Sequence, residues 1–171
     1  MLQSGDLIFV RSHIDRPVED LISFGEFLLE REQKQKVAHL YCHVAVYVGG
    51  NTVYEAQGGR KSGPANLGDY FGDYDIGHLK ITDNQRRAFL GALPKENGLP
   101  YDWTGIFWLV VYILTLKRCG RRYHEQRRRY CSKYVEWALG LAGVVVDGLT
   151  PSTLALDEHV QIEVCAKVRA V

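Results

Sequence analysis

The sequence lacks the cysteine patterns of a zinc protein or of a disulfide-rich protein. Its 171 residues include four cysteines, at positions 42, 119, 131 and 165, with no Cys-x-x-Cys pair and no paired spacing. Neither a zinc site nor a disulfide framework is therefore expected. The six histidines also show no metal-ligand spacing, and we expect no metal and no organic cofactor.

Strong net charge and targeting signals are also missing. The formal net charge is +1, which gives no overall attraction to nucleic acid or to an anionic surface. The N-terminus leads from Met1 directly into an expected strand at residue 6, with no signal peptide before it. The sequence as it stands therefore predicts a cytoplasmic protein, or one that another route delivers to the cell envelope.

The most apolar segment is too short to cross a membrane. Residues 105–116 (GIFWLVVYILTL) are apolar on all sides, but a spanning helix needs roughly 20 residues. The segment is either a buried helix or an element that faces a membrane or an acyl chain. Basic residues follow it at positions 117, 118, 121, 122, 127, 128 and 129. They form either a solvated face or, with the apolar segment, a peripheral membrane contact through residues 105–129.

The chain does contain an ordinary succession of strands and helices. No repeat or linker divides it, and 46% apolar and 24% charged residues are typical of one globular domain, here residues 1–171. Sequence patterns predict strands at 6–11, 78–81 and 160–168 and helices that begin near residue 16, at 84–93 and at 131. Residues 58–77 are rich in Gly, Asp and Tyr and are expected to form a loop.

Cys131 is the strongest candidate for a catalytic residue. Val135 and Leu139 follow it at helical spacing, and Gly140 is a stop signal. Cys131 is thus expected in the first turn of a helix, where unpaired N–H groups and the positive end of the helix dipole favour a thiolate. A cysteine paired with a histidine base is a nucleophile, whereas a cysteine alone is commonly a small buried apolar residue.

The candidate base is His43, on the first strand of an expected β-hairpin. Two β-rich runs flank the Gly-Gly-Asn sequence at 49–51. With these three residues as the loop, His43 faces Gln57, and Glu55 lies diagonally across on the same face. Either side chain could hold the imidazole in the tautomer that a base requires. A loop shorter by one residue would turn Glu55 to the other face.

These residues carry a resemblance to a known family. The matching segments are GDLIFV at 5–10, CHVAVYVG at 42–49, VYEA at 53–56, YD at 101–102, YCSKYV at 130–135 and PSTL at 151–154. Their order resembles that of the circularly permuted NlpC-type cysteine hydrolases, a branch that includes the YiiX-like bacterial proteins and the lecithin:retinol acyltransferase group. Histidine precedes cysteine in that branch, as it does here. Cys42 departs from the serine that the family often has.

The resemblance implies an α+β, papain-like domain in which a small antiparallel sheet packs against helices. It also implies a Cys-His-Glu triad with Cys131 as the nucleophile, His43 as the base and Glu55 as the orienting residue. Gln57 is the alternate orienting residue. Tyr130 either approaches the oxyanion of a bound substrate or packs in the core.

The implied chemistry is acyl transfer through an acyl-enzyme. The expected activity is that of a cysteine peptidase or amidase, acting on an amide bond in a cell-wall peptide or a similar isopeptide. Two alternatives stay open: a lipid acyltransferase or thioesterase, favoured by residues 105–129, and a non-catalytic binding module on the same fold. The expected partner is thus a peptide or a lipid acyl substrate, not nucleic acid. The sequence does not determine the oligomeric state.

Overall fold

The computed structural model describes residues 2–12, 39–115 and 128–166 and has an α+β fold. Six antiparallel strands form one sheet in the order β4-β3-β2-β1-β5-β6. The strands are β1 (Leu7–Arg11), β2 (Tyr41–Gly49), β3 (Thr52–Glu55), β4 (Gly63–Asn66), β5 (Tyr74–Leu79) and β6 (Val160–Glu163). The predicted α+β class with an antiparallel sheet packed against helices is confirmed.

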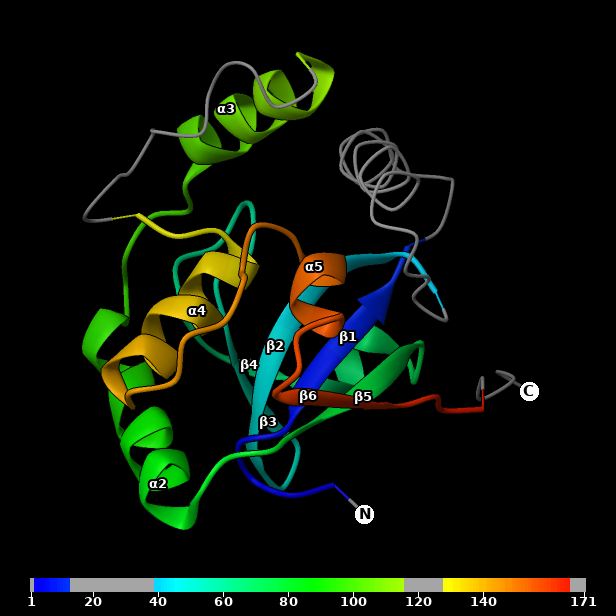
Figure 1. Ribbon diagram of the computed structural model, residues 1–171, viewed down its shortest axis with the longest axis vertical. Helices are drawn as coiled ribbons and strands as arrows, with labels where there is room; N and C mark the ends of the chain where they lie inside the picture. Colours follow the sequence, from blue (N-terminus) through cyan, green and yellow to red (C-terminus); the bar gives the residue numbers. More distant parts are fainter. Residues whose placement is uncertain (1, 13–38, 116–127, 167–171) are drawn as a thin grey trace.

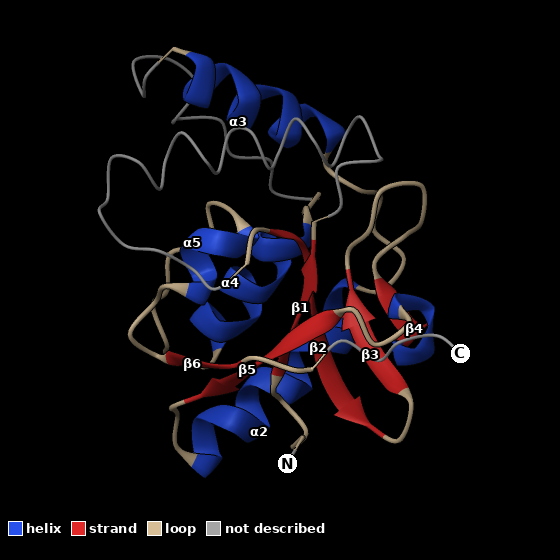
Figure 2. Cartoon of the chain, turned by 90° about the vertical axis from the view of Figure 1, so that its right-hand side faces the viewer, coloured by secondary structure: helices blue, strands red, loops and turns tan. Residues whose placement is uncertain are grey.

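Four α-helices and two short 3-10 helices accompany the sheet in the described residues. The α-helices are α2 (Asp83–Ala92), α3 (Trp103–Leu114), α4 (Cys131–Leu141) and α5 (Pro151–Ala155), and the 3-10 helices are η1 (Leu67–Tyr70) and η2 (Leu93–Glu96). Figures 1 and 2 show α4 and α5 on the same side of the sheet, with α3 standing apart from the other helices.

Side chains that alternate between the two faces of β1 and β2 contribute to two apolar clusters, one on each side of the sheet. Phe9 pairs with Val44 across β1 and β2, and both side chains join the cluster on the helix side of the sheet. The next pair, Ile8 and Ala45, joins the cluster on the opposite side. The helix-side cluster also includes buried residues of α2, α4 and α5: Phe89, Ala92, Tyr134, Val135, Ala138, Leu139, Leu154 and Ala155. This packing seats α4 against β2.

The β2–β3 hairpin has the register expected from the sequence, although its turn differs. Val46 pairs with Tyr54 and Tyr47 with Val53, as predicted. Gly49 then pairs with Thr52 after an irregularity in the ladder, so the turn contains two residues instead of three. The φ of Gly49 is 122°, a backbone conformation that glycine adopts without steric cost. The irregularity absorbs the missing loop residue and leaves Glu55 on its predicted face.

The expectation of a loop over residues 58–77 is wrong. This segment contains β4, η1 and the beginning of β5, which starts at Tyr74 and not at the predicted residue 78. β4 includes Gly63 and Pro64, two residues that are poor strand formers in isolation. It is an edge strand, where proline is tolerated, and it is defined by its pairing with β3.

The other expected elements need smaller corrections. The predicted strand at 160–168 is seen over Val160–Glu163, and the helix at 84–93 is α2 followed by η2. The helix expected near residue 16 and the basic positions 117–127 lie outside the described residues.

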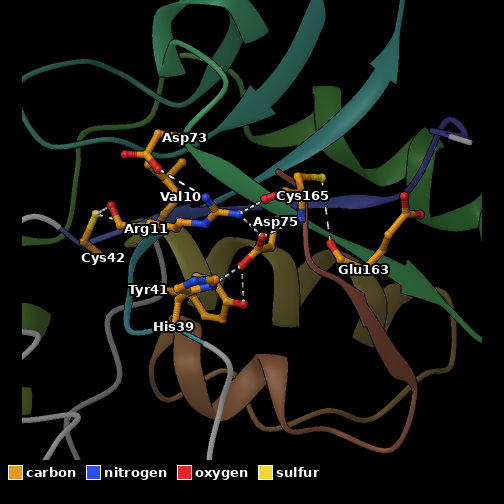
Figure 3. A network of polar contacts seen from close by, with 9 residues as sticks. All are labelled: Val10, Arg11, His39, Tyr41, Cys42, Asp73, Asp75, Glu163 and Cys165. Carbon is orange, nitrogen blue, oxygen red and sulfur yellow. Dashed lines mark hydrogen bonds and ion pairs between the residues drawn. The ribbon is translucent and has the colours of Figure 1, made fainter. Parts of the chain in front are cut away.

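A buried polar network joins one end of the sheet to the segment that follows β6 (Figure 3). Its centre is Asp75, a fully buried carboxylate that pairs with Arg11. His39 Nδ1 lies 2.8 Å from the carboxylate, the Tyr41 hydroxyl donates to it at 2.9 Å, and the Cys165 backbone N–H donates at 2.9 Å. Burial alone raises the pKa of Asp75, but these hydrogen bonds, with that of Arg11 the largest, hold it below its ordinary value.

Candidate active site

Cys131 is the first residue of α4, as the sequence predicts. Its side chain is buried, and the preceding residue, Tyr130, gives the helix no side-chain cap. The unpaired N–H groups of the first turn, together with the positive end of the helix dipole, therefore lie next to the thiol. The helix is held in this position because Val135, Ala138 and Leu139 are completely buried against the sheet.

His43 lies on β2 and connects Cys131 to Glu55. Its Nε2 is 2.7 Å from Glu55 Oε2, and both side chains are buried. The Cys131 side chain is the second hydrogen-bonding neighbour of the ring. Because Nε2 faces Glu55, Nδ1 is the ring nitrogen left for the thiol. The three residues that the sequence singles out are thus brought together from β2, β3 and α4.

The surroundings of His43 favour its protonated form. Burial alone lowers the pKa of the imidazole, since a desolvated cation is unfavourable. The hydrogen bonds and charges of Cys131 and Glu55 outweigh burial and raise the pKa of His43 from its ordinary 6.5 to about 10. The ring can therefore hold a proton between two acidic partners at neutral pH.

Glu55 is held by two further residues that sequence reasoning missed. The Tyr70 hydroxyl donates to Oε2, the oxygen that faces His43, and Arg60 Nη2 donates to Oε1 at 2.8 Å. Burial alone raises the pKa of Glu55, but His43, Tyr70 and Arg60 together hold it below its ordinary value. Both residues lie in the segment expected to be a loop, and no motif in the sequence marks either of them.

The other two predicted site residues have different partners. The side-chain oxygen of Gln57 accepts hydrogen bonds from Arg60 at 2.6 and 3.1 Å. Tyr130 is buried, and its hydroxyl donates to the Leu149 carbonyl at 3.2 Å. In the described part of the chain neither side chain bonds to His43, and the carboxylate in contact with the imidazole is that of Glu55.

Aromatic side chains lead from Cys131 to the exposed side of α3. Tyr101 packs against the helix-side cluster that includes Cys131 and also against Ile106, Leu109 and Tyr130. The Tyr101 ring is 5.1 Å from that of Trp103, and a Cβ at Gly58 would lie 2.9 Å from the Trp103 ring. Gly58 therefore allows the indole to pack against the chain three residues beyond Glu55.

The apolar segment at 105–116 is only partly the buried helix that its length suggests. Ile106 and Leu109 are buried, whereas Phe107 is 60% and Trp108 37% exposed. Asp102 caps the helix by accepting a 2.8 Å hydrogen bond from the Gly105 N–H. No helix over the described ranges is long and apolar enough to span a bilayer. Over the same residues, no three His, Cys, Asp or Glu side chains are grouped to hold a metal ion.

The fold is that of a YiiX-like α+β protein. Comparison with solved structures finds the metalloprotein YiiX from Escherichia coli O157:H7, with a TM-score of 0.61 at 16% sequence identity over 97% of each chain. No family model and no curated protein matches the sequence. At this level of identity the likeness concerns the fold, and it agrees with the YiiX-like resemblance drawn from the sequence motifs.

Proposed function

We propose that this protein is a cysteine hydrolase that cleaves an amide bond in a cell-wall peptide or a similar isopeptide, on a circularly permuted NlpC-type scaffold. The observation that carries the proposal is the position of the His43 ring, between the Glu55 carboxylate and the thiol that begins α4. A base that is hydrogen-bonded to a nucleophile on one side and to an orienting group on the other is typical of a cysteine hydrolase.

The proposed reaction runs in two halves. His43 Nδ1 takes the thiol proton, and the Cys131 sulfur attacks the carbonyl carbon while the Cys131 backbone N–H stabilises the oxyanion. The C–N bond then breaks, His43 returns its proton to the leaving amine, and an acyl-enzyme remains. In the second half His43 deprotonates a water molecule, which attacks the thioester, releases the carboxylic acid and restores the thiol.

The proposed mechanism assigns no step to a metal ion. The structural neighbour YiiX is described as a metalloprotein. The described residues of this chain do not supply a matching donor group, because no three potential ligands are clustered. All proton transfers in the proposal are assigned to His43.

The test compares the wild type with Cys131→Ser and His43→Ala on a panel of amide, ester and thioester substrates that includes a muropeptide. Cys131→Ser is expected to lose turnover with a nearly unchanged melting temperature, because serine is a much poorer nucleophile beside the same base. His43→Ala is expected to lose turnover because it removes the base, and it is assayed well below its own melting temperature. Cys165→Ser is the control, since Cys165 follows β6 and its backbone N–H bonds to Asp75, outside the candidate site. Equal turnover by wild type and Cys131→Ser would exclude Cys131 as the nucleophile.

Iodoacetamide labelling separates an enzyme from a non-catalytic binding module on the same fold. A nucleophile paired with His43 is expected to be alkylated at pH 6 faster than the other three cysteines. Mass mapping after brief treatment identifies the labelled residue. Slow labelling of Cys131, together with no turnover on the substrate panel, would favour the binding module.

A lipid acyltransferase or thioesterase is the second candidate, and the aromatic path from Cys131 to α3 favours it. Tyr101 packs against the cluster that includes Cys131, its ring lies 5.1 Å from that of Trp103, and Phe107 one turn further along α3 is exposed, so these rings offer an apolar surface to an acyl chain. α3 carries no charged residue, whereas Arg128 is exposed and the preceding residues are rich in Lys and Arg. An uncharged aromatic helix followed by basic residues suits the surface of an anionic bilayer.

Parallel assays with a muropeptide and a phospholipid decide between the two candidates. For the lipid enzyme, binding to phosphatidylserine vesicles should fall in Trp103→Ala and Phe107→Ala. Leu141→Ala is the control, because Leu141 is similarly exposed but lies at the far end of α4 from Cys131. Vesicle binding that is equal in all four proteins, with cleavage of the muropeptide alone, would exclude the lipid enzyme.

A further inference from the structure

We propose that Tyr70 and Arg60 are positioning residues that fix the Glu55 carboxylate with Oε2 towards His43. The proposal rests on the proposed function for its catalytic consequence, but its geometry stands on the contacts of Glu55 alone. Each carboxylate oxygen has its own donor: the Tyr70 hydroxyl on Oε2 and the Arg60 guanidinium on Oε1. A carboxylate bonded at both oxygens cannot rotate away from the imidazole.

Tyr70 supplies a donor whose direction is fixed by the core. Its side chain is buried in the apolar cluster with Ile8, Ala45 and Val53, and its ring centroid lies 6.0 Å from that of His43. An ionised Glu55 can only accept hydrogen bonds. Burial and the charge of Glu55 raise the pKa of the phenol, so Tyr70 stays protonated and donates throughout the neutral range.

Arg60 supplies the counter-charge that a buried carboxylate requires. Its guanidinium is itself held by the side-chain oxygen of Gln57 at 2.6 Å and by Asp69 of η1 at 3.8 Å. With Arg60 in place, Glu55 keeps a cationic partner even when His43 gives up its proton during the reaction. The carboxylate therefore has no need to take the proton itself.

The segment from Gln57 to Tyr70 thus forms a brace around Glu55, defined here as Gln57, Arg60, Asp69 and Tyr70. The brace explains the contacts of Gln57, which supports Arg60 and not the imidazole. By holding Oε2 against Nε2, the brace keeps a proton on Nε2 and leaves Nδ1 to exchange protons with the thiol. The groups that face Glu55 from the packed elements are His43, Tyr70 and Arg60.

The test measures the His43 ring directly by NMR of ¹⁵N-histidine-labelled protein. The chain has six histidines, and the signal missing from His43→Ala identifies His43. The wild type is expected to show a downfield, slowly exchanging proton on Nε2. The signal should weaken in Tyr70→Phe and in Arg60→Gln and be lost in the double variant. Arg60→Lys, which keeps the charge, should restore part of it.

Two matched controls remove the same groups elsewhere. Tyr134→Phe deletes a buried hydroxyl that donates to the Leu93 carbonyl at 2.7 Å, and Arg87→Gln deletes an arginine on the exposed side of α2. Neither should change the His43 signal. In a turnover assay the double variant should lose roughly 10- to 100-fold in kcat with little change in KM, because a misplaced base slows the chemical step.

Each outcome has one interpretation. A His43 signal in Tyr70→Phe and Arg60→Gln that equals the wild type would overturn the brace, whatever the activity. A signal that is lost in the variants, when the wild type itself turns over no substrate, would support the brace and count against the proposed function instead. Arg60 is half exposed, so Arg60→Gln tests the brace even where Tyr70→Phe fails to fold.

Discussion

Replacement of Glu55 by glutamine is the most informative single change in this site, because it keeps the shape of the side chain and removes its charge. Glu55 Oε2 accepts from both His43 and Tyr70, and Oε1 accepts from Arg60. An amide has one oxygen and one NH2 group, so one of these positions must become a donor. Whichever way the amide turns, its NH2 group faces a group that can only donate, unless His43 changes its tautomer.

The expected loss of kcat in Glu55→Gln depends on whether His43 changes its tautomer. If the NH2 group faces His43, Nε2 must accept a hydrogen bond and the proton moves to Nδ1, the nitrogen that has to receive the thiol proton. A base in the wrong tautomer costs about 10⁴-fold in kcat in the comparable serine-protease triad. If the NH2 group faces Arg60 instead, the tautomer survives and a smaller loss of about 100-fold is expected from misplacement. We expect Glu55→Gln to lie between these limits.

The assay is kcat on the substrate found by the panel, measured for the wild type, Glu55→Gln and Glu163→Gln. Glu163 is a matched control, because its carboxylate also lies 2.7 Å from a histidine, His78 Nε2, but at an exposed position on β6. Glu163→Gln should keep full activity and the melting temperature of the wild type, and kcat of Glu55→Gln is measured well below its own melting temperature. A kcat for Glu55→Gln within twofold of the wild type would refute the orienting role of Glu55.

Three further predictions concern pH, stability and metal dependence. Because the pKa of His43 is raised from 6.5 to about 10, its partners stabilise the fold fully below pH 6.5, and this contribution disappears as pH rises through about 10. The free energy of unfolding, measured with urea from pH 6 to 10.5, should therefore fall more for the wild type than for His43→Gln. An equal fall in the two proteins would contradict the ion pair. Asp75→Asn leaves Arg11 without its main buried counter-charge. It should lower the free energy of unfolding by about 3 kcal/mol and the melting temperature by roughly 6–12 °C. A change in melting temperature below about 1 °C would show that the network of Figure 3 does not stabilise the fold. Dialysis against a chelator should leave turnover unchanged, and a loss that a divalent ion restores would refute the metal-free mechanism.

Local patterns in the sequence predict the elements that carry the site better than they predict the rest of the sheet. The β2–β3 pairing follows from two β-rich runs around a Gly-Gly-Asn turn, and the start of α4 follows from apolar residues at helical spacing. β4 and the first half of β5 have no such pattern, because their residues form strands through pairing with β3 and β1. Strand propensity depends on neighbours that a single sequence does not reveal.

The contact between His43 and Glu55 was predictable for the same local reason. Both residues lie in one hairpin, and the period of two along a strand decides which side chains share a face. The contacts of Tyr70 and Arg60 with Glu55 were not predictable, since they depend on the path of the chain through β4 and η1. The choice of Glu55 over Gln57 also needed the structure, because only the structure shows that Gln57 is bonded to Arg60.

The two halves of the candidate site are therefore positioned by different physical constraints. The pair of His43 and Glu55 is set by a hairpin register, which is all or nothing, since a slip of one residue turns Glu55 to the other face. Cys131 is set by the packing of α4 on β2, which can shift by small amounts as side chains change volume. Substitutions in the core between α4 and β2 should thus change the contact between thiol and imidazole gradually, while the contact between imidazole and carboxylate stays fixed. The brace supports the contact between imidazole and carboxylate only, so the adjustable contact in this site is the one across which the thiol proton moves in the proposed reaction.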